Sequence, residues 1–467
     1  MVASHCRLRN IMSQNVSSKY TMDLTEGSIL KKLLLFSLPL MASNVLQLFF
    51  NAADIIVVGQ FAGDNSLAAV GSTSSVIHLL TNVFMGLSVG VNVLVAHHFA
   101  AKQEDELRKT IHTAITISLL CGIIMILIGE LAAEQVLKMM DTPAEVLDLA
   151  VLYLRVYFLG MPATVLYNFG AAILRAIGDT KRPLYFLTFA GLVNLVLNCV
   201  FVIVFHMDVA GVAIATVIAQ CISALLVLRC LVNEAEPIHL TRRGLGIDRG
   251  ILVKIIQIGL PAGIQSSLFS LSNVVIQSSI NGFGSLVMAG NSAASNLEGF
   301  LNVMVTAFSQ GGVAFVSQNI GAKKYERINK IVITLLLCVL VTGIVFGNVI
   351  YALGEPLLRL YTDSQDVVAA GMKRMMYASC FYFLFGMMDS MVAVMRGMGR
   401  SVAPMIVALL GVCGFRLLWI AVMFSNPAFH AIETVYIAYP LSWGLTFIVH
   451  TICFIFVRRG FKAKWGI

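Results

Sequence analysis

The chain has 467 residues, of which 58% are hydrophobic and 12% are charged. A soluble globular domain carries about 25% charged residues, and a soluble core of this chain could not bury so many long apolar runs, so the composition indicates an integral membrane protein. The formal net charge of +8 does not indicate nucleic-acid binding, because the basic residues lie between the apolar runs, where they orient membrane helices.

The chain begins with a polar segment, residues 1–28, which lacks the apolar centre of a cleaved secretion signal. We therefore expect a cytoplasmic tail followed by an uncleaved first membrane span. The nine cysteines are scattered and form no CxxC pair. This pattern favours small core residues over a disulfide framework or a zinc site.

Apolar runs long enough to span a membrane recur along the chain. A spanning helix needs about 20 mostly apolar residues, and these runs are too long, and alternate too little, to be strands of a membrane barrel. The sequence therefore predicts an all-α integral membrane protein. Its twelve predicted spans lie at roughly 33–60, 68–99, 110–132, 148–176, 184–206, 209–232, 251–281, 285–320, 328–353, 368–398, 403–424 and 432–457.

Basic residues gather in the first tail, in every second connection and in the last tail. By the positive-inside rule, this distribution predicts a multi-pass protein of the cell inner (plasma) membrane with both termini in the cytoplasm. The opposite side has little beyond Lys138, Arg359, Lys373 and Arg374. The cytoplasmic side holds Lys31, Lys32, Lys102, Arg108, Lys109, Lys181, Arg182, Arg242, Arg243, Arg249, Lys323, Lys324, Arg327, Lys330, Arg458, Arg459, Lys462 and Lys464.

The two halves of the chain repeat each other. Three segments of the first half match segments of the second at nearly the same offset, each after the same number of spans. The duplication predicts an N-lobe at 29–232, a cytoplasmic linker at 233–250, a C-lobe at 251–457 and a basic tail at 458–467. The matching segments are SLPL (37–40) with GLPA (259–262), AKQEDELRK (101–109) with AKKYERINK (322–330), and LRAIGDTKRPL (174–184) with MRGMGRSVAPM (395–405).

Each half contains an even number of predicted spans, so both halves enter the membrane from the same face. Two such six-helix lobes are related by a pseudo-two-fold axis along the membrane normal, and they suit alternating access to a central site. The sequence contains no catalytic or metal-ligand motif and no GxxxxGK[ST] loop. We therefore expect a transporter driven by an ion gradient, and not an enzyme or a receptor.

Asp54 lies within an otherwise apolar stretch of the first span. A charge at the bilayer centre costs about 2.5–3.5 kcal/mol on insertion scales, and an intramembrane acid is by default a functional site. The alternative is a structural hydrogen bond to a neighbouring span. Asn194 and Asn198, one helical turn apart in span 5, and Thr216 in span 6 could add oxygen ligands. This oxygen-only set favours Na⁺ or a proton over a soft metal.

Glu298 in span 8, Asp389 in span 10 and Arg416 in span 11 are candidates for a second buried group. Two acids and one arginine leave a net charge of −1, which a proton or a cationic substrate would balance. The alternative is a static arginine–carboxylate clamp between spans 10 and 11. Aromatic residues that could present faces to organic cations are Phe49, Phe50, Tyr157, Tyr167, Phe381 and Tyr382.

These features together resemble the multidrug and toxic compound extrusion (MATE) family of transporters. The resemblance covers about residues 28–457. It is carried in combination by Leu38–Pro39 and its repeat Leu260–Pro261, NAADIIVVGQFAGDNSLAAVG (51–71), FVSQNIGAKKYER (315–327), LRAIGDTKRP (174–183) and MRGMGRSVAP (395–404).

The resemblance implies export of organic, cationic amphiphilic drugs in exchange for Na⁺ or H⁺, without another cofactor. The cation site of the family's first lobe falls on Asp54, Asn194, Asn198 and Thr216. Because residue 198 is an asparagine, a single carboxylate remains there, which leaves both coupling ions open. The glutamate that some members carry in span 7 has no counterpart in IQSSLFSLSNVVIQSSI (264–280).

We expect a monomer surrounded by membrane lipids, whose partners are small organic cations and not nucleic acid. The alternative function is that of a lipid-linked oligosaccharide or lipid flippase of the related superfamily. Such a flippase would need a basic cleft for pyrophosphate. The sequence offers a single mid-span arginine, Arg416, against three mid-span acids, which favours cationic cargo.

Overall fold

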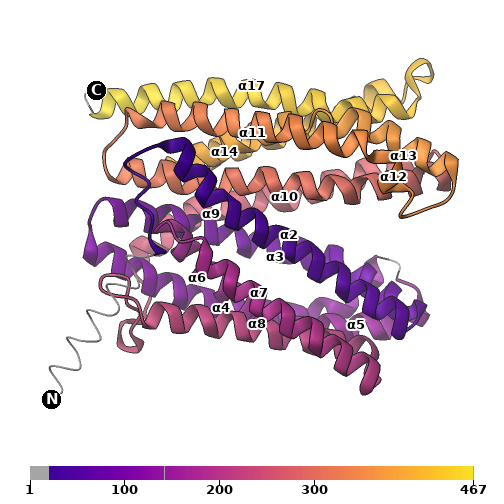
Figure 1. Cartoon of the computed structure of the whole chain (residues 1–467), viewed down its shortest axis with the longest axis horizontal. Coiled ribbons are helices and arrows are strands. Elements are labelled where there is room, and N and C mark those ends of the chain that lie inside the picture. Colours follow the sequence, from indigo (N-terminus) through magenta and orange to yellow (C-terminus); the bar gives the residue numbers. More distant parts are fainter. Residues whose placement is uncertain (1–19, 141, 466–467) are drawn as a thin grey trace. The chain divides into compact units, whose positions relative to one another are not determined.

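The computed structural model describes residues 20–140 and 142–465, and this part of the chain is built of helices without a strand. The predicted tails 1–28 and 458–467 therefore lie partly outside the described residues. Figure 1 follows the helices in chain order. The first half contains α2 (Ile29–Phe61), α3 (Asp64–Ala100), α4 (Glu104–Met139), α5 (Ala144–Leu159), α6 (Met161–Ala176), α7 (Lys181–Asn198), the π-helix η1 (Cys199–Val204), α8 (Asp208–Val232) and the 3₁₀-helix η2 (Arg242–Gly244).

The second half has the same succession of long helices, with additional short helical elements between them. It contains α9 (Arg249–Asn281), α10 (Ser285–Gly321), α11 (Arg327–Ala352), the short α12 (Gly354–Leu358), α13 (Gln365–Ala378), α14 (Tyr382–Gly397), α15 (Val402–Ala408), the π-helix η3 (Leu409–Gly414), α16 (Phe415–Trp419), the π-helix η4 (Ile420–Phe424), the 3₁₀-helix η5 (Pro427–Phe429) and α17 (Ile432–Trp465).

The twelve predicted spans correspond to helices of the described chain. Ten helical stretches are long and apolar enough to cross a membrane, and two bent helix pairs bring the number to twelve when each pair is one span. The all-α prediction is confirmed. Most of the helices extend past the predicted ends, because the chain stays helical beyond the apolar segment from which each span was recognised.

The two bent spans occur at matching places in the two halves. α5 and α6 meet at Gly160 with a bend of 46°, and α13 and α14 meet at residues 379–381 with a bend of 45°. The same steric contact accompanies each bend. A Cβ added at Gly122 of α4 would overlap Pro162, and one added at Gly343 of α11 would overlap Phe383. The second contact repeats the first at the offset of the sequence duplication.

The chain divides into two compact units. Unit 1 contains residues 38–263 and 321–323 with the described residues before 27, and unit 2 contains residues 27–37, 264–320 and the rest of the chain from 324. The first part of α2 thus groups with unit 2, and the first part of α9 groups with unit 1. These boundaries fall close to Pro39 and Pro261, the prolines inside α2 and α9.

Close helix packing in unit 1 uses glycines at a four-residue spacing. A Cβ added at Gly86 of α3 would overlap the backbone of Gly263 in α9, and one added at Gly90 would overlap the carbonyl oxygen of Ile255. Gly86 and Gly90 thus form a GxxxG pattern that makes a close helix contact, and the partner helix α9 carries a second such pattern, Gly259 with Gly263. Small residues allow this approach of two backbones.

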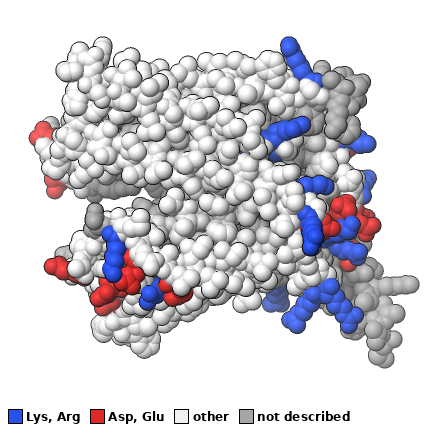
Figure 2. All heavy atoms as spheres, turned by 180° about the vertical axis from the view of Figure 1, so that it is seen from behind, with Lys and Arg blue, Asp and Glu red and all other residues white. Residues whose placement is uncertain are grey.

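The surface of the spans is apolar. Figure 2 shows one face of the protein, on which Lys, Arg, Asp and Glu gather toward the left and right sides, with a broad band of uncharged side chains between them. Large apolar side chains such as Leu131, Leu410 and Phe456 are among the most exposed residues of their helices. In lipid such a surface is favourable, whereas in water it would promote aggregation.

Candidate functional sites

The four residues of the predicted cation site lie together in unit 1. Asp54 of α2 accepts a hydrogen bond from the amide nitrogen of Asn198, at the end of α7. The same nitrogen lies 3.3 Å from Oδ1 of Asn194, and Nδ2 of Asn194 lies 3.3 Å from Oγ1 of Thr216 in α8. The structure thus links three helices through one chain of polar groups.

Local features of α2 and α7 explain why these groups meet. Gly191 has no side chain, and a Cβ there would overlap the ring of Phe50, so α2 lies directly against α7 a few residues from Asp54. Immediately after Asn198 the helix widens into the π-helix η1. Single π-turns are frequent at functional sites because they displace the backbone hydrogen-bonding pattern.

The side-chain amide oxygen of Asn198 accepts no hydrogen bond from any described residue. This atom, Oδ1, is buried, while Nδ2 of Asn198 donates to Asp54. A carboxylate only accepts hydrogen bonds, so the amide nitrogen faces Asp54 when the acid is ionised. The oxygens of Asp54, Asn198 and Thr216 are hard donors of the kind that hold Na⁺, and the free amide oxygen could equally accept a bond from a protonated Asp54.

Two tyrosines complete the surroundings of Asp54. Tyr153 and Tyr157 of α5 stack with ring centroids 5.9 Å apart, and both interact electrostatically with Asp54. Both belong to the apolar core of unit 1 around Val57 and Val58. Sequence reasoning missed Tyr153, because its spacing is that of an ordinary core residue. Tyr157 was expected near organic cargo and lies near the acid.

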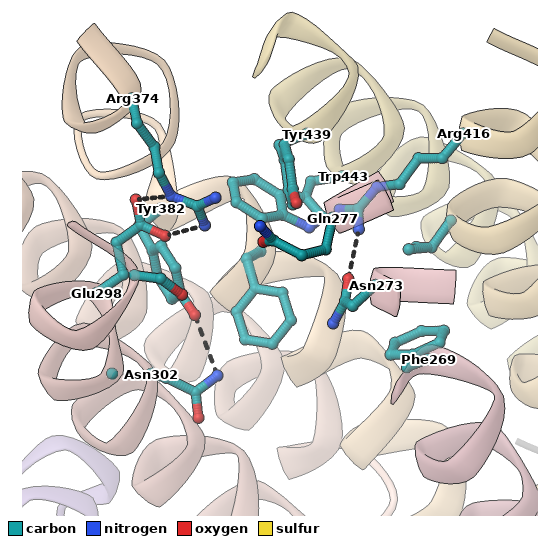
Figure 3. A pocket seen from close by; sticks show the side chains of 14 residues that line it. Phe269, Asn273, Gln277, Glu298, Asn302, Arg374, Tyr382, Arg416, Tyr439 and Trp443 are labelled. Carbon is teal, nitrogen blue, oxygen red and sulfur yellow. Dashed lines mark hydrogen bonds and ion pairs between the residues drawn. The ribbon is translucent and has the colours of Figure 1, made fainter. Parts of the chain in front are cut away.

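A separate cavity of about 400 Å³ lies within unit 2. Figure 3 shows its polar residues arranged in two groups, Arg374 with Glu298 and Arg416 with Asn273, with aromatic rings around them. The cavity is lined by Phe269, Asn273, Gln277, Ser295, Glu298, Gly299, Asn302, Arg374, Tyr382, Phe385, Val412, Arg416, Tyr439 and Trp443.

Glu298 forms its ion pair with Arg374 of α13. The carboxylate accepts two hydrogen bonds from Arg374, one from Nη2 at 2.7 Å and one from Nε at 3.1 Å. Both side chains of this two-pronged pair are buried. Nη1 of Arg374 donates to Asn291 at 2.6 Å. The structure therefore corrects the predicted clamp: a buried arginine–carboxylate pair exists, but it joins α13 to α10 and does not involve Arg416.

Arg416 lies at the other side of this cavity, in α16 between the two π-helices η3 and η4. Its Nε donates to Oγ of Ser442 at 2.9 Å, and its Nη1 lies 3.4 Å from Oδ1 of Asn273. The guanidinium carbon is 4.4 Å from the centre of the Tyr439 ring and 5.6 Å from that of Trp443. Among the described residues no carboxylate pairs with it.

Asp389 does not line the cavity. It lies on α14, half-buried, where it interacts with Ser309 and Arg396. Glu298, Asp389 and Arg416, which the sequence grouped together, therefore do not form one site. The net charge expected for the site was −1, whereas the charged residues that line the cavity sum to +1. The cavity holds one acid and two arginines. Of the six aromatic residues expected near cargo, Tyr382 is the one among its lining residues.

Sequence reasoning also missed Arg374. It was counted with the basic residues at the outer ends of the spans, because Lys373 precedes it and the run 368–398 had just begun. Lys373 does lie near the surface, paired with Glu433 at 2.5 Å, whereas Arg374 turns inward. The sequence did contain one indication of this pairing: Glu298 lies within a predicted span, and a buried carboxylate needs a positively charged partner.

Comparison with known proteins gives the family. The MatE family model matches residues 39–200 and 261–422, well over half of the chain. The two matched ranges have the same length, so that residue 39 of the first corresponds to residue 261 of the second. The internal duplication inferred from short motifs is thus confirmed by a repeated match to one family.

Similar proteins support this family, and a solved transporter structure shares the fold of the chain. The chain is 26% identical over 432 residues to the probable multidrug resistance protein YoeA of Bacillus subtilis, covering 91% of this chain and 93% of the relative. It is 28% identical to YpnP of the same organism over 389 residues, covering 83% and 87%. A solved MOP superfamily transporter from Pyrococcus furiosus superposes with a TM-score of 0.88 at 21% identity, covering 94% and 98%.

The resemblance recognised from the sequence motifs is therefore confirmed, and with it the expectation of a multi-pass membrane transporter. The chain belongs to the multidrug and toxic compound extrusion (MATE) family.

Proposed function

We propose that the protein is a secondary antiporter that exports small organic compounds in exchange for Na⁺ or H⁺ taken up at Asp54. The observation that carries the proposal is the polar chain of Asp54, Asn198, Asn194 and Thr216, with the unused amide oxygen of Asn198 buried inside it. An intramembrane acid with oxygen neighbours is suited to bind and release a small cation. The relatives, which include multidrug resistance and multidrug export proteins, support organic cargo.

Exchange of the ion would act through the amide of Asn198. With Asp54 ionised and free of a cation, Nδ2 of Asn198 donates to the carboxylate. When Na⁺ or a proton neutralises Asp54, that hydrogen bond loses its charge assistance, and turning the amide presents its oxygen instead. The η1 π-helix next to Asn198 gives the backbone room to follow this change. Coupling requires only that cargo affinity differ between the two states, typically by about 1–3 kcal/mol.

The orientation and the transport cycle belong to the same proposal. We place both termini in the cytoplasm of a plasma-membrane protein, because Lys and Arg predominate in the connections on that side. The protein acts as a monomer among membrane lipids, and its two lobes expose the cargo site alternately to each side.

Cationic cargo stays a prediction from the sequence and the family resemblance. The cavity of unit 2 favours a different charge, because Arg374 adds a second arginine to it. The same arginine supports the second candidate function, a flippase for lipid-linked oligosaccharide or lipid, which was disfavoured for lack of basic groups.

Transport by the purified protein in sealed vesicles tests the proposal. A pH gradient and a Na⁺ gradient are imposed separately, and efflux of a cationic dye, an anionic dye and a labelled lipid-linked oligosaccharide is recorded. We expect one ion gradient to drive dye efflux in the wild type and neither gradient to drive it in Asp54→Asn. Glu130→Gln removes a half-exposed acid of α4 and is the control that should transport normally. Equal gradient-driven efflux in wild type and Asp54→Asn would remove Asp54 from the mechanism.

A further inference from the structure

We propose that the cavity of unit 2 is an anion subsite, in which Arg416 binds the carboxylate, sulfonate or phosphate of an amphiphilic cargo whose apolar body lies against Tyr439 and Trp443. The proposal rests on the proposed export of organic compounds and names the chemical class of ligand that this cavity accepts. It follows from the charge of the cavity, from the partners of Arg416 and from the aromatic side chains that line the cavity.

The charged groups of the cavity leave one positive charge without a partner. Its charged lining residues are Glu298, Arg374 and Arg416. Glu298 and Arg374 neutralise each other through the two-pronged pair described above. The remaining formal charge is that of Arg416, so a ligand with a negative group would balance the cavity and a ligand cation would add to the imbalance.

Arg416 is buried, at 3% exposure, yet its hydrogen-bond partners are neutral. An arginine keeps its charge in proteins, and a charge within the membrane region is costly when no opposite charge compensates it. The hydroxyl of Ser442 and the amide oxygen of Asn273 accept two of its N–H groups. No described residue accepts a hydrogen bond from Nη2, so a donor edge of the planar guanidinium is available for a two-pronged bond to an oxyanion.

The aromatic lining suits the apolar part of such a ligand. The Tyr439 ring lies near both guanidinium groups, 4.4 Å from that of Arg416 and 5.4 Å from that of Arg374. Trp443 contacts Tyr439 and Phe385 edge to face, at 5.8 and 5.7 Å. A cavity of about 400 Å³ lies within the range of about 300–1,000 Å³ that is usual for small-molecule sites.

The internal repeat allows the polar groups of unit 2 to be compared with those of unit 1. By the matched motifs 174–184 and 395–405, Asn194 aligns with Phe415, so Arg416 is the residue that follows the counterpart of Asn194. Near the start of the family-matched ranges, where residue 39 corresponds to residue 261, Ile276 is the counterpart of Asp54 and is a core residue of unit 2. Unit 1 thus has an acid among neutral amides, whereas unit 2 has an apolar residue at the position of that acid and a separate arginine among neutral partners. The charge of the second site is opposite in sign to that of the first.

Arg416 also joins α16 to α17 through Ser442 and to α9 through Asn273, so a purely structural role must be separated from binding. If Arg416 only held these helices together, its hydrogen bonds would be needed but its positive charge would not. Arg416→Gln retains amide donors and removes the charge. Asn273→Glu leaves Arg416 in place and supplies a carboxylate beside it, and Asn273→Gln is its neutral control. Arg396→Gln removes another arginine of unit 2, which contacts Gln265 and does not line the cavity.

The test measures binding without a gradient, by calorimetry on the purified full chain in neutral detergent. The two probes share a ring system and differ in charge: 2-naphthalenesulfonate and 2-naphthylmethylammonium. We expect the sulfonate to bind at least tenfold more tightly than the ammonium. Arg416→Gln and Asn273→Glu should each weaken sulfonate binding at least tenfold. Asn273→Gln should weaken it less than Asn273→Glu does, and Arg396→Gln should change it less than threefold.

Absence of sulfonate binding, tighter binding of the ammonium, or equal affinities in wild type and Asn273→Glu would overturn the proposal. Thermal unfolding of each variant shows whether it is folded, and Asn273→Glu keeps the test decisive if Arg416→Gln is not. Nanodiscs of phosphatidylglycerol, compared with phosphatidylcholine, show by competition whether a lipid can be the source of the anion. Asp54→Asn should bind the sulfonate normally, so loss of coupled transport with intact binding, or the reverse, separates the two proposals.

Discussion

The polar groups of unit 1 and unit 2 differ in charge, although the two units are repeats of each other. Around Asp54 a single acid is surrounded by amides and a hydroxyl. In the cavity of unit 2 a single unpaired arginine is surrounded by amides, a hydroxyl and aromatic rings. One environment suits a small cation and the other suits an anionic group.

The scaffold around these groups differs much less. Each unit has a bent span, a glycine of the preceding span packed against that bend, and a π-helix, η1 or η4, at the corresponding place. The duplication has therefore kept the contacts that set helix positions, while the side chains suited to ions and cargo have diverged. Repeat symmetry thus predicts where a site lies but not what it binds.

The buried ion pair of unit 2 should give the greatest loss of stability. Glu298→Gln leaves Arg374 buried without an opposite charge, which should reduce the free energy of unfolding by about 3–5 kcal/mol. Unfolding in detergent measures the loss. Glu355→Gln, which breaks an exposed pair with Arg359 at 2.9 Å, should cost less than about 1 kcal/mol. The double variant Glu298→Gln/Arg374→Gln should recover part of the loss; equal costs for the buried and exposed single variants would show that the pair is not desolvated.

A second variant gives unit 1 the charge of unit 2. Asn194→Arg places a guanidinium next to Asn198 and within reach of Asp54, so the acid acquires a permanent counter-charge and no longer needs a cation. We expect ion-driven efflux to fall at least 100-fold, about 2.7 kcal/mol at about 1.36 kcal/mol per factor of ten. Asn194→Gln is the neutral control. Wild-type coupling in a folded Asn194→Arg protein would show that the charge at this position does not control the site.

Changes in the shared scaffold should have weaker consequences. Gly122→Ala and Gly343→Ala each insert a methyl group where Pro162 or Phe383 already lies, and each should lower the free energy of unfolding by about 1–3 kcal/mol. The two losses should be similar, because the contacts are repeats of each other. Gly71→Ala, where a Cβ meets nothing within 4 Å, should be neutral or slightly stabilising. Strongly unequal losses would show that the two bends are packed differently.

Much of the fold was predictable because hydropathy marks every span and the motifs mark the duplication. The polar chain from Asp54 to Thr216 was also within reach, since intramembrane acids and amides are rare enough to stand out. The second site was not, because its charge depends on which side chains meet. Arg374 looked like a surface residue beside Lys373, and Asp389 looked like a site residue. A bend between α13 and α14 and the inward turn of one arginine decide the pairing, and neither is visible in a hydropathy pattern.

Ion binding to the purified protein without cargo isolates the role of Asp54 from every later step of transport. Na⁺ is added to the protein in weakly buffered solution with a pH-sensitive dye, over a range of starting pH values, for the wild type, Asp54→Asn and Glu130→Gln. If Asp54 is where Na⁺ or a proton is exchanged, the wild type and Glu130→Gln will take up protons at low pH in a step that Asp54→Asn lacks, and any proton release caused by Na⁺ will disappear in the same variant. Identical proton and Na⁺ titrations in wild type and Asp54→Asn would rule out ion exchange at this carboxylate.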